Sequence, residues 1–326
     1  VLVLGVGGFC VLHGWGGVTL GVVIAFLTYV RDFFRPLDGL SNRAGMLQQA
    51  LAACERIYQL FQEEEEISDP LQPALLPPTP QNIAFERVDF AYLADTPVLY
   101  EVSFTIAPGE IVAVVGATGS GKTTLVNLLM RFYAPTAGGI RLGAHDLRDL
   151  RQEELRRHFG TVRQEPFIFS ATVAENIALM NPATSREDII VAAQQANADA
   201  FIRRLEQGYD TKLRERGAGL SAGQKQLLAL ARIMLQREAR VLILDEATAN
   251  VDSETEGWIQ DALKTVMVGR TGIIIAHRLS TIRHADRILV FQQGRLVAQG
   301  RHEDLLRQGG YYRRLYEYLA MTENSG

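Results

Sequence analysis

The chain reads Gly116-Ala117-Thr118-Gly119-Ser120-Gly121-Lys122-Thr123 directly after the apolar run Ile111–Val115. The β-branched residues of that run are typical of a strand buried on both faces. From residue 122 to residue 132 apolar side chains recur at helical spacing, so the glycines lie at a strand-to-helix turn. Glycines at such a turn let backbone N–H groups converge on an anion at the start of a helix. The pattern predicts a loop that binds phosphate groups.

Two side chains of this loop extend the prediction to a nucleotide. Lys122 supplies a mobile positive charge for β- and γ-phosphates, and the Thr123 hydroxyl is placed to bind Mg²⁺. By chance, the constrained positions would occur together in roughly one chain in a hundred of this length. The flanking strand and helix make coincidence rarer still, so we expect nucleotide binding.

Composition narrows the class of protein. With 326 residues, 47% of them hydrophobic, the chain is long enough for one large domain and a smaller part. Neither the net charge of −4 nor any basic tract favours a nucleic-acid partner. The two cysteines, Cys10 and Cys54, lie far apart, so the sequence predicts neither a disulfide framework nor a metal cluster. This usage fits a reducing cytosol.

The first thirty residues contain no Asp, Glu, Lys or Arg, which is a membrane composition. Glycines and a tryptophan at residues 13–17 interrupt the run, so we expect two transmembrane helices joined by a tight turn. The first twelve residues are too short to cross a bilayer and the chain does not begin with Met, so we expect a fragment that starts inside a membrane segment. A signal peptide is the alternative, but neither a basic region nor a cleavage site flanks the run.

The second helix is expected to extend past any bilayer, because helical periodicity runs on to residue 60. Arginines accumulate on that side and predict that it is cytoplasmic. Arg31 and Asp32 either face a substrate cavity or lie at the interface, with Asp32 paired to Arg35. Glutamates at 63–66 and prolines between residues 70 and 80 end the periodicity and predict a linker with a solvated acidic surface.

Beyond the linker, residues 83–92 and 98–106 alternate apolar and polar side chains and predict an antiparallel sheet beside the nucleotide. Tyr92 lies where this sheet would meet the base, so it either stacks on adenine or belongs to the core. Short strands are expected at 139–142 and 159–162, with a polar helix at 151–158. Helices at 185–198 and 221–236, with no strand pattern between them, predict a helical insertion.

Two further apolar runs end in residues suited to catalysis. Residues 241–244 predict a central parallel strand that ends in Asp245-Glu246, at the edge where open α/β sheets bind ligands. Asp245 is suited to hold Mg²⁺ and Glu246 to polarise the attacking water, the alternative being a buried structural acid pair. Residues 273–276 predict another buried strand, and His277 at its end is either a core residue or a hydrogen-bonding sensor of the γ-phosphate.

These motifs resemble those of the ATP-binding cassette family, specifically the exporters in which a membrane domain precedes the nucleotide-binding domain. The resemblance covers essentially the whole chain. The motifs stand in the family's order: the phosphate loop, Gln164 as the Q-loop, Leu220-Ser221-Ala222-Gly223-Gln224 as the signature, Asp245-Glu246, Asp252 in the D-loop and His277 as the switch histidine. Tyr92 falls at the family's adenine-stacking position, and Glu215-Arg216-Gly217 is similar to the exporters' coupling loop.

The resemblance implies an α/β fold with a P-loop NTPase core of the RecA type, an antiparallel β subdomain and a helical subdomain, preceded by transmembrane helices. It implies the end of a transmembrane domain at 1–66, a linker at 67–81 and the nucleotide-binding domain at 82–322, with earlier membrane helices missing. The implied cofactors are ATP and Mg²⁺. Nucleotide contacts would come from Tyr92, Gly116, Ala117, Thr118, Gly119, Ser120, Gly121, Lys122, Thr123, Thr124, Ser221, Gly223, Gln224 and Asp252; Mg²⁺ would be held by Thr123, Gln164 and Asp245; Glu246, His277 and Gln164 would be catalytic.

The implied function is ATP-driven export by a pair of half-transporters, with a homodimer favoured and a heterodimer possible. The implied place is a membrane, specifically a bacterial inner membrane with the nucleotide-binding domain in the cytoplasm. The partners would be a second half-transporter, membrane lipid and an unidentified exported substrate, with no nucleic acid. Drug, lipid, peptide and siderophore cargoes all stay open.

Two departures and two alternatives accompany this hypothesis. Ala222 replaces the usual glycine of the signature, and if that position needs a positive φ the alanine costs on the order of 1 kcal/mol. Asn250-Val251 replaces the commoner D-loop residues. A soluble cassette ATPase that acts on DNA or ribosomes is disfavoured by the apolar N-terminus. A regulatory cassette without turnover would be expected to lack Glu246 or His277, and both are present.

Overall fold

The computed structural model describes residues 2–62, 67–77, 79–245, 253–276 and 279–323. The chain divides into two compact units, residues 1–66 (unit 1) and 67–326 (unit 2). Each unit is described by itself.

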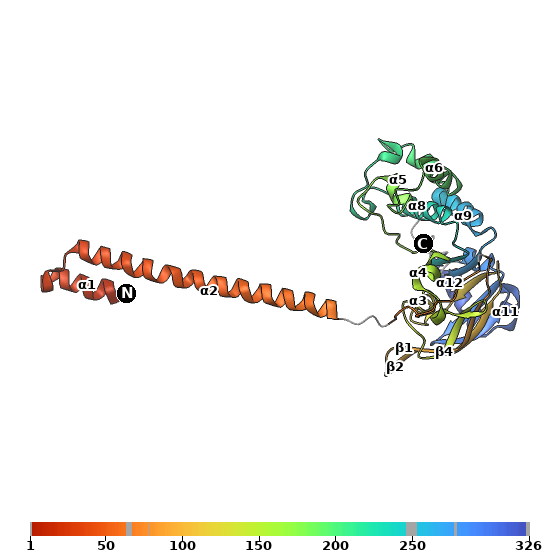
Figure 1. The fold of residues 1–326 in the computed structure, drawn as a ribbon, viewed down its shortest axis with the longest axis horizontal. Coiled ribbons are helices and arrows are strands. Elements are labelled where there is room, and N and C mark those ends of the chain that lie inside the picture. Colours follow the sequence, from red (N-terminus) through yellow and green to blue (C-terminus); the bar gives the residue numbers. More distant parts are fainter. Residues whose placement is uncertain (1, 63–66, 78, 246–252, 277–278, 324–326) are drawn as a thin grey trace. The chain divides into compact units, whose positions relative to one another are not determined.

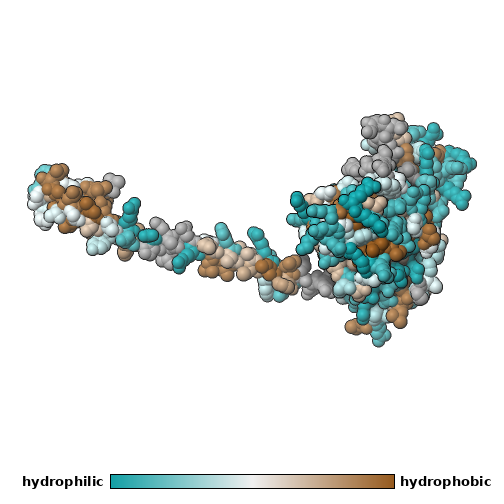
Figure 2. Space-filling view, turned by 90° about the horizontal axis from the view of Figure 1, so that it is seen from above, coloured by the Kyte–Doolittle hydropathy of each residue, from teal (hydrophilic) through white to brown (hydrophobic). Residues whose placement is uncertain are grey.

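Unit 1 consists of two helices joined by a glycine turn. They are α1 (Leu2–Leu12) and α2 (Leu20–Gln62), with the short 3-10 helix η1 (Trp15–Gly17) between them. The turn forms because Gly14, Gly16 and Gly17 adopt left-handed φ angles of 64°, 71° and 67°. Hydrophobic residues gather over α1 and the adjoining start of α2 (Figure 2). Two helices joined by a tight turn are as predicted. None of the helices in the described ranges, however, combines the length and the apolar composition needed to span a membrane.

The larger sheet of unit 2 is mostly parallel. Its described strands have the order β10-β9-β3-β8-β7-β6, and every neighbouring pair is parallel except β10 with β9. The strands are β3 (Ile111–Val115), β6 (Phe159–Val162), β7 (Val241–Asp245), β8 (Thr271–Ile275), β9 (Arg287–Gln292) and β10 (Arg295–Gly300). In β3 and β7, four of five side chains are buried, because both faces of the sheet are covered. The parallel strands predicted from uninterrupted apolar runs are therefore confirmed.

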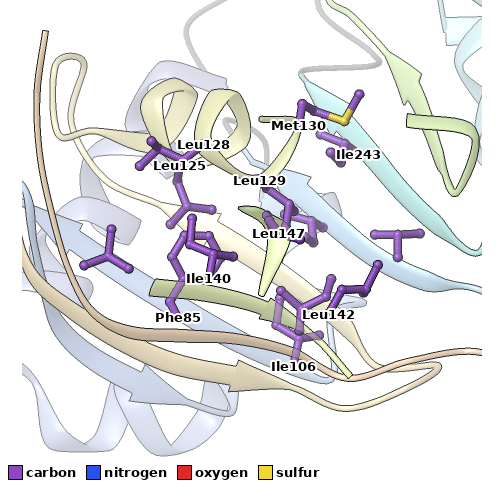
Figure 3. Packing of buried hydrophobic residues seen from close by; sticks show 14 of the residues in the cluster. Phe85, Ile106, Leu125, Leu128, Leu129, Met130, Ile140, Leu142, Leu147 and Ile243 are labelled. Carbon is purple, nitrogen blue, oxygen red and sulfur yellow. The ribbon is translucent and has the colours of Figure 1, made fainter. Parts of the chain in front are cut away.

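A second sheet is antiparallel, as the alternating pattern predicts, and has the order β2-β1-β4-β5. Its strands are β1 (Ile83–Leu93), β2 (Thr96–Ile106), β4 (Ala137–Leu142) and β5 (His145–Asp146). Helix α3 (Lys122–Leu129) packs against this sheet: Leu125, Leu128 and Leu129 meet Phe85 and Ile140 in one buried cluster (Figure 3). The cluster also contains Ile243 of β7, so α3 is held between the two sheets and its first turn is placed at the carboxyl edge of β3.

A helical part completes unit 2 at a distance from β1, β2 and β4 (Figure 1). Its helices pack on one another around alanine and leucine side chains; they are α5 (Val173–Ile177), α6 (Arg186–Gln195), α8 (Ala222–Leu235) and α9 (Ser253–Met267). The predicted helix at 185–198 is α6 alone, with a separate α7 after it. The described helices of unit 2 are α3, η2 (Leu147–Asp149), α4 (Gln152–Arg157), α5 (Val173–Ile177), α6 (Arg186–Gln195), α7 (Asp199–Ile202), η3 (Gly208–Asp210), η4 (Glu215–Gly217), α8 (Ala222–Leu235), α9 (Ser253–Met267), α10 (Leu279–Arg283), α11 (His302–Gln308) and α12 (Gly310–Glu323).

Candidate nucleotide-binding site

The predicted phosphate loop is a tight turn between β3 and α3. Each of its three glycines is required there by a different structural constraint. A side chain at Gly116 would place its Cβ 2.4 Å from the carbonyl oxygen of Phe291 on β9. A Cβ at Gly121 would lie 2.5 Å from Leu99, and its φ of 99° is left-handed. Gly119 has open space around it but a φ of 78°. Packing excludes side chains at the first and last of these positions, and backbone conformation disfavours one at the middle position.

Lys122 is held across the mouth of the loop. Its Nζ donates hydrogen bonds to the carbonyl oxygens of Gly116 (2.8 Å) and Ala117 (3.1 Å), and only 7% of the residue is exposed. The Ser120 side chain is 3% exposed, and among the described residues its Oγ has no hydrogen-bond partner. A buried hydroxyl that still needs a partner, next to a lysine at a helix N-terminus, fits a bound phosphate group. Thr123 is exposed at the second residue of α3, so its hydroxyl is accessible to a metal ion.

Strand register brings the other predicted residues to the same edge of the sheet. Val114 of β3 pairs with Ile275 of β8, and Ile275 pairs with Asp245 at the end of β7. On β6, Val162 pairs with Leu244, so the chain leaves the sheet toward Gln164 at the same edge as Asp245. Asp245 is half-buried and Gln164 is exposed. Carboxyl ends of parallel strands are where ligands bind in open α/β sheets.

Three predicted residues lie outside the described part of the chain. They are Glu246, Asp252 and His277. The residues before Glu246 and His277 are described: Asp245 ends β7, and the Ala276 backbone N–H donates to the carbonyl of Val114 (3.1 Å). The roles of Glu246 and His277 therefore stay predictions.

Tyr92 lies near the end of β1 and contacts the start of the loop helix. Its hydroxyl is 3.2 Å from the Thr124 Oγ1 and accepts a hydrogen bond from Asn127 Nδ2 (3.3 Å). The ring makes an edge contact with Tyr133, with centroids 4.9 Å apart, and 45% of the residue is exposed. This exposure leaves ring surface accessible, and adenine stacking by Tyr92 and a nucleotide contact by Thr124 both remain predictions.

The signature begins α8 with both halves of a capping box. The Gln224 backbone N–H donates to the Ser221 Oγ (3.2 Å), and the Ser221 N–H donates to the Gln224 Oε1 (3.0 Å). Ala222 is the first helical residue and has no positive φ, so the penalty considered for replacing glycine does not arise. Left-handed residues occur earlier instead, at Arg216 (55°) and Gly219 (101°), and they shape the turn that leads into the signature.

Two polar residues on the buried side of α8 were missed by sequence reasoning. Gln226, 1% exposed, donates from Nε2 to the carbonyl of Gln164 (3.4 Å), and Arg232, 9% exposed, donates from Nη1 to the carbonyl of Phe167 (2.6 Å). Six helical residues rise about 9 Å and three extended residues span about 10 Å, so the segment from Gln164 to Phe167 runs along α8. The available signal was the presence of a glutamine and an arginine among the leucines and alanines of this helix.

Arg232 also joins α8 to α5. Its Nε and Nη2 donate to the backbone oxygen and Oδ1 of Asn176, both at 2.9 Å, and Asn176 is fully buried. The Asn176 amide in turn donates to the carbonyl of Phe169 (3.1 Å). Burial lowers the pKa of Arg232 to about 10. The hydrogen bonds therefore hold a cation that is unfavourably desolvated, and they attach the Gln164 segment to the helix that carries the signature.

A glycine loop at a helix N-terminus, a buried lysine over that loop and an aspartate at the end of a parallel strand define the class of protein: it is a P-loop NTPase domain with an α/β fold.

The family follows from comparison with known proteins. Residues 99–249 match the family described as ABC transporter, and the chain carries a domain of that family. It is 42% identical over 97% of its length to an uncharacterized ABC transporter ATP-binding protein of Bacillus subtilis, of which it covers 52%. It is 46% identical over 92% of its length to an ATP-dependent lipid A-core flippase of Chromobacterium violaceum, of which it covers 51%. The chain thus spans about half the length of the curated relatives it matches.

A solved structure shows the same relationship. The structure of a bacterial Atm1-family ABC exporter with ATP bound superposes with a TM-score of 0.76 at 39% identity, over 98% of this chain and 56% of that one. The expectation of an ABC exporter drawn from the ordered motifs is therefore confirmed at the level of the family.

Proposed function

We propose that this chain is part of an ATP-driven exporter, in which two nucleotide-binding domains pair around ATP and hydrolysis resets the transporter. The observation that carries the proposal is the convergence of the phosphate loop, Asp245 and the Gln164 segment at one edge of the parallel sheet. The family match and the ABC exporter relatives support the coupling of this ATPase to transport.

The residues of the site fit ATP and Mg²⁺. The loop amides and Lys122 would hold the β- and γ-phosphates, and the orphan Ser120 hydroxyl adds a further donor. Thr123, Gln164 and Asp245 would hold Mg²⁺, which supplies charge neutralisation between the phosphates. Glu246 is assigned to polarise the attacking water and His277 to contact the γ-phosphate. Tyr92 would stack on the adenine.

A second half-transporter would complete each ATP site. Ser221, Gly223 and Gln224 of one chain would close on the nucleotide held by Lys122 of the other, at the N-terminus of α8. We favour a homodimer, because the departures at Ala222 and Asn250-Val251 remove none of the residues assigned to catalysis. The apolar residues 1–30 and the exporter relatives support a membrane location for unit 1, with unit 2 in the cytoplasm. The cargo is open, and the lipid A-core flippase among the relatives makes a lipid the first class to test.

The test is a pair of substitutions in the intact protein. We expect Glu246→Gln to lower ATP turnover at least about a hundredfold while ATP affinity is retained, because the amide keeps the shape of the site but cannot accept a proton. Lys122→Ala should instead weaken ATP binding about tenfold or more, since it removes a charged hydrogen-bond donor. Turnover and nucleotide affinity are measured side by side.

Either of two results would contradict the assignment. Near-normal turnover in Glu246→Gln would remove Glu246 as the base. An intact wild-type protein that binds ATP but never hydrolyses it would favour a regulatory cassette, and recovery of the intact protein outside the membrane fraction would favour a soluble ATPase.

A further inference from the structure

Residues 67–76, part of the linker predicted at 67–81, lie against the rest of unit 2 and are hydrogen-bonded to it near both ends. We call this segment the connector strap. Its attachment centres on Arg131, two residues after the end of the phosphate-loop helix α3. Arg131 donates from Nη2 to the carbonyl of Ser68 (2.8 Å) and from Nη1 to the carbonyl of Leu150. The Asp69 carboxylate lies 3.6 Å from the same guanidinium.

A second attachment comes from Gln152 in the first turn of α4. Its backbone N–H donates to the Asp69 Oδ1 (2.9 Å), and its side chain donates to the carbonyl of Ile67 (2.8 Å). The Gln152 Oε1 accepts a hydrogen bond from Arg156 (2.8 Å), which also donates to the carbonyl of Arg131 (3.1 Å). The start of the strap, α4 and the end of α3 thus share one hydrogen-bond network.

The far end of the strap is fixed to α4 and the residues before it. The Ala74 N–H donates to the carbonyl of Asp149 (2.8 Å), and Ala74 forms a parallel bridge with Leu150. The Leu76 N–H donates to the Glu154 carboxylate (3.2 Å), and its side chain, 9% exposed, joins the core around α3. A ten-residue segment without regular structure is therefore held at both ends, by residues 67–69 and by Ala74 and Leu76.

Arg131 is buried and has an uncommon backbone conformation, so surrounding contacts must hold it in place. Its side chain is buried, and burial lowers its pKa although Asp69 opposes the shift. Its φ of 53° is left-handed, which is uncommon for a residue with a side chain. Several contacts are needed to keep a buried guanidinium in that backbone conformation, and the strap carbonyl of Ser68 is one of them.

We propose that the connector strap transmits nucleotide binding from α3 to α2, with Arg131 as the positioning residue that joins the two. This inference rests on the proposed function, because in an ATP-driven exporter α2 would be the helix that the ATP cycle moves. Helix α2 ends at Gln62, and four residues separate it from the strap in the sequence. Phosphates held at the first turn of α3 would restrain the whole helix, and its other end contacts the strap through Arg131.

The test is hydrogen–deuterium exchange on the intact protein with and without ATP. In wild type we expect ATP to slow exchange about threefold or more both in the strap and in the last two turns of α2. An insertion of Gly-Ser-Gly between Glu66 and Ile67 leaves every strap contact in place but slackens the connection. It should keep the protection of the strap and lose that of α2. Arg131→Lys should lose both, because the Ser68 carbonyl is bound by Nη2 whereas the Leu150 carbonyl and Asp69 lie at Nη1, and the single nitrogen of a shorter lysine head group cannot occupy both places.

The control is Arg157→Lys in α4, where an exposed arginine pairs with Glu153 at the surface, 2.6 Å away. It should behave as wild type. ATP binding without protection of the strap, or an insertion variant whose α2 is protected as in wild type, would overturn the proposal. Turnover is not needed for this readout, so a protein that fails to hydrolyse ATP but shows both protections would contradict the proposed function and support the strap.

Discussion

Replacing Arg232 with methionine is expected to destabilise unit 2 and free the Gln164 segment from α8. Methionine keeps an unbranched apolar stem but has no N–H groups. The carbonyls of Phe167 and Asn176 and the Asn176 Oδ1 therefore each lose the hydrogen bond that they accept from Arg232. Hydrogen bonds to a charged group contribute about 1.5–3 kcal/mol each, or about 5–9 kcal/mol for three if they were additive. Against this, the fall in pKa from 12.5 to about 10 corresponds to about 3 kcal/mol of unfavourable burial that methionine avoids. The net loss is therefore about 2–6 kcal/mol.

The assay is thermal unfolding of the intact protein, followed by tryptophan fluorescence. For a domain of this size 1 kcal/mol corresponds to about 2–4 °C, so the midpoint should fall by about 4–24 °C. Arg237→Met is the matched control, since Arg237 follows α8 and pairs with Asp188 at the surface with 83% of its side chain exposed. Its midpoint should change by less than about 2 °C. An Arg232→Met midpoint no lower than that of the control would refute the reasoning.

Two further predictions concern the loop and the C-terminal helices. Gly116→Ala should destabilise the protein more than Gly119→Ala, since the first places a Cβ 2.4 Å from the Phe291 carbonyl and the second carries only a left-handed penalty of about 1 kcal/mol; equal thermal midpoints would contradict this. His302 has a pKa lowered by burial and by nearby Arg283, and its Nδ1 lies 2.7 Å from the Tyr312 hydroxyl. The folded state therefore resists protonation, so stability should fall as pH drops below about 6.5. His302→Gln should flatten that dependence in midpoints measured between pH 5.5 and 7.5, and an unchanged slope would exclude His302 as its source.

Sequence-based prediction succeeds best for features that depend only on residues adjacent in the chain. The loop from Gly116 to Thr123, the buried strand β7 and the capping position of Ser221 each follow from a few adjacent residues. Some elements were readable but missed: α5 begins with the capping box Thr172 to Glu175, and the β9–β10 hairpin turns at Gln293-Gly294.

The remaining features depend on partners that are distant in sequence. Arg131 bonds to Ser68, 63 positions away, and Arg232 bonds to Phe167, 65 positions away. No periodicity links such residues, because their proximity follows from the packing of whole elements. The prolines correctly predict that residues 67–76 form no helix or strand, yet they say nothing about where the segment lies. A linker prediction from composition describes local conformation and does not specify which residues the segment contacts.

The capping box at Ser221 has a consequence for the energetics of pairing. A loop that becomes ordered only on contact loses about 1–2 kcal/mol of backbone entropy for each residue fixed. In this chain Ser221 and Gln224 already hold each other while the chain is alone, so the ordering of the signature belongs to folding. In the pair that we propose, ATP-driven closure would then bring together two rigid surfaces, and the entropy lost would be mainly that of the domains as whole bodies.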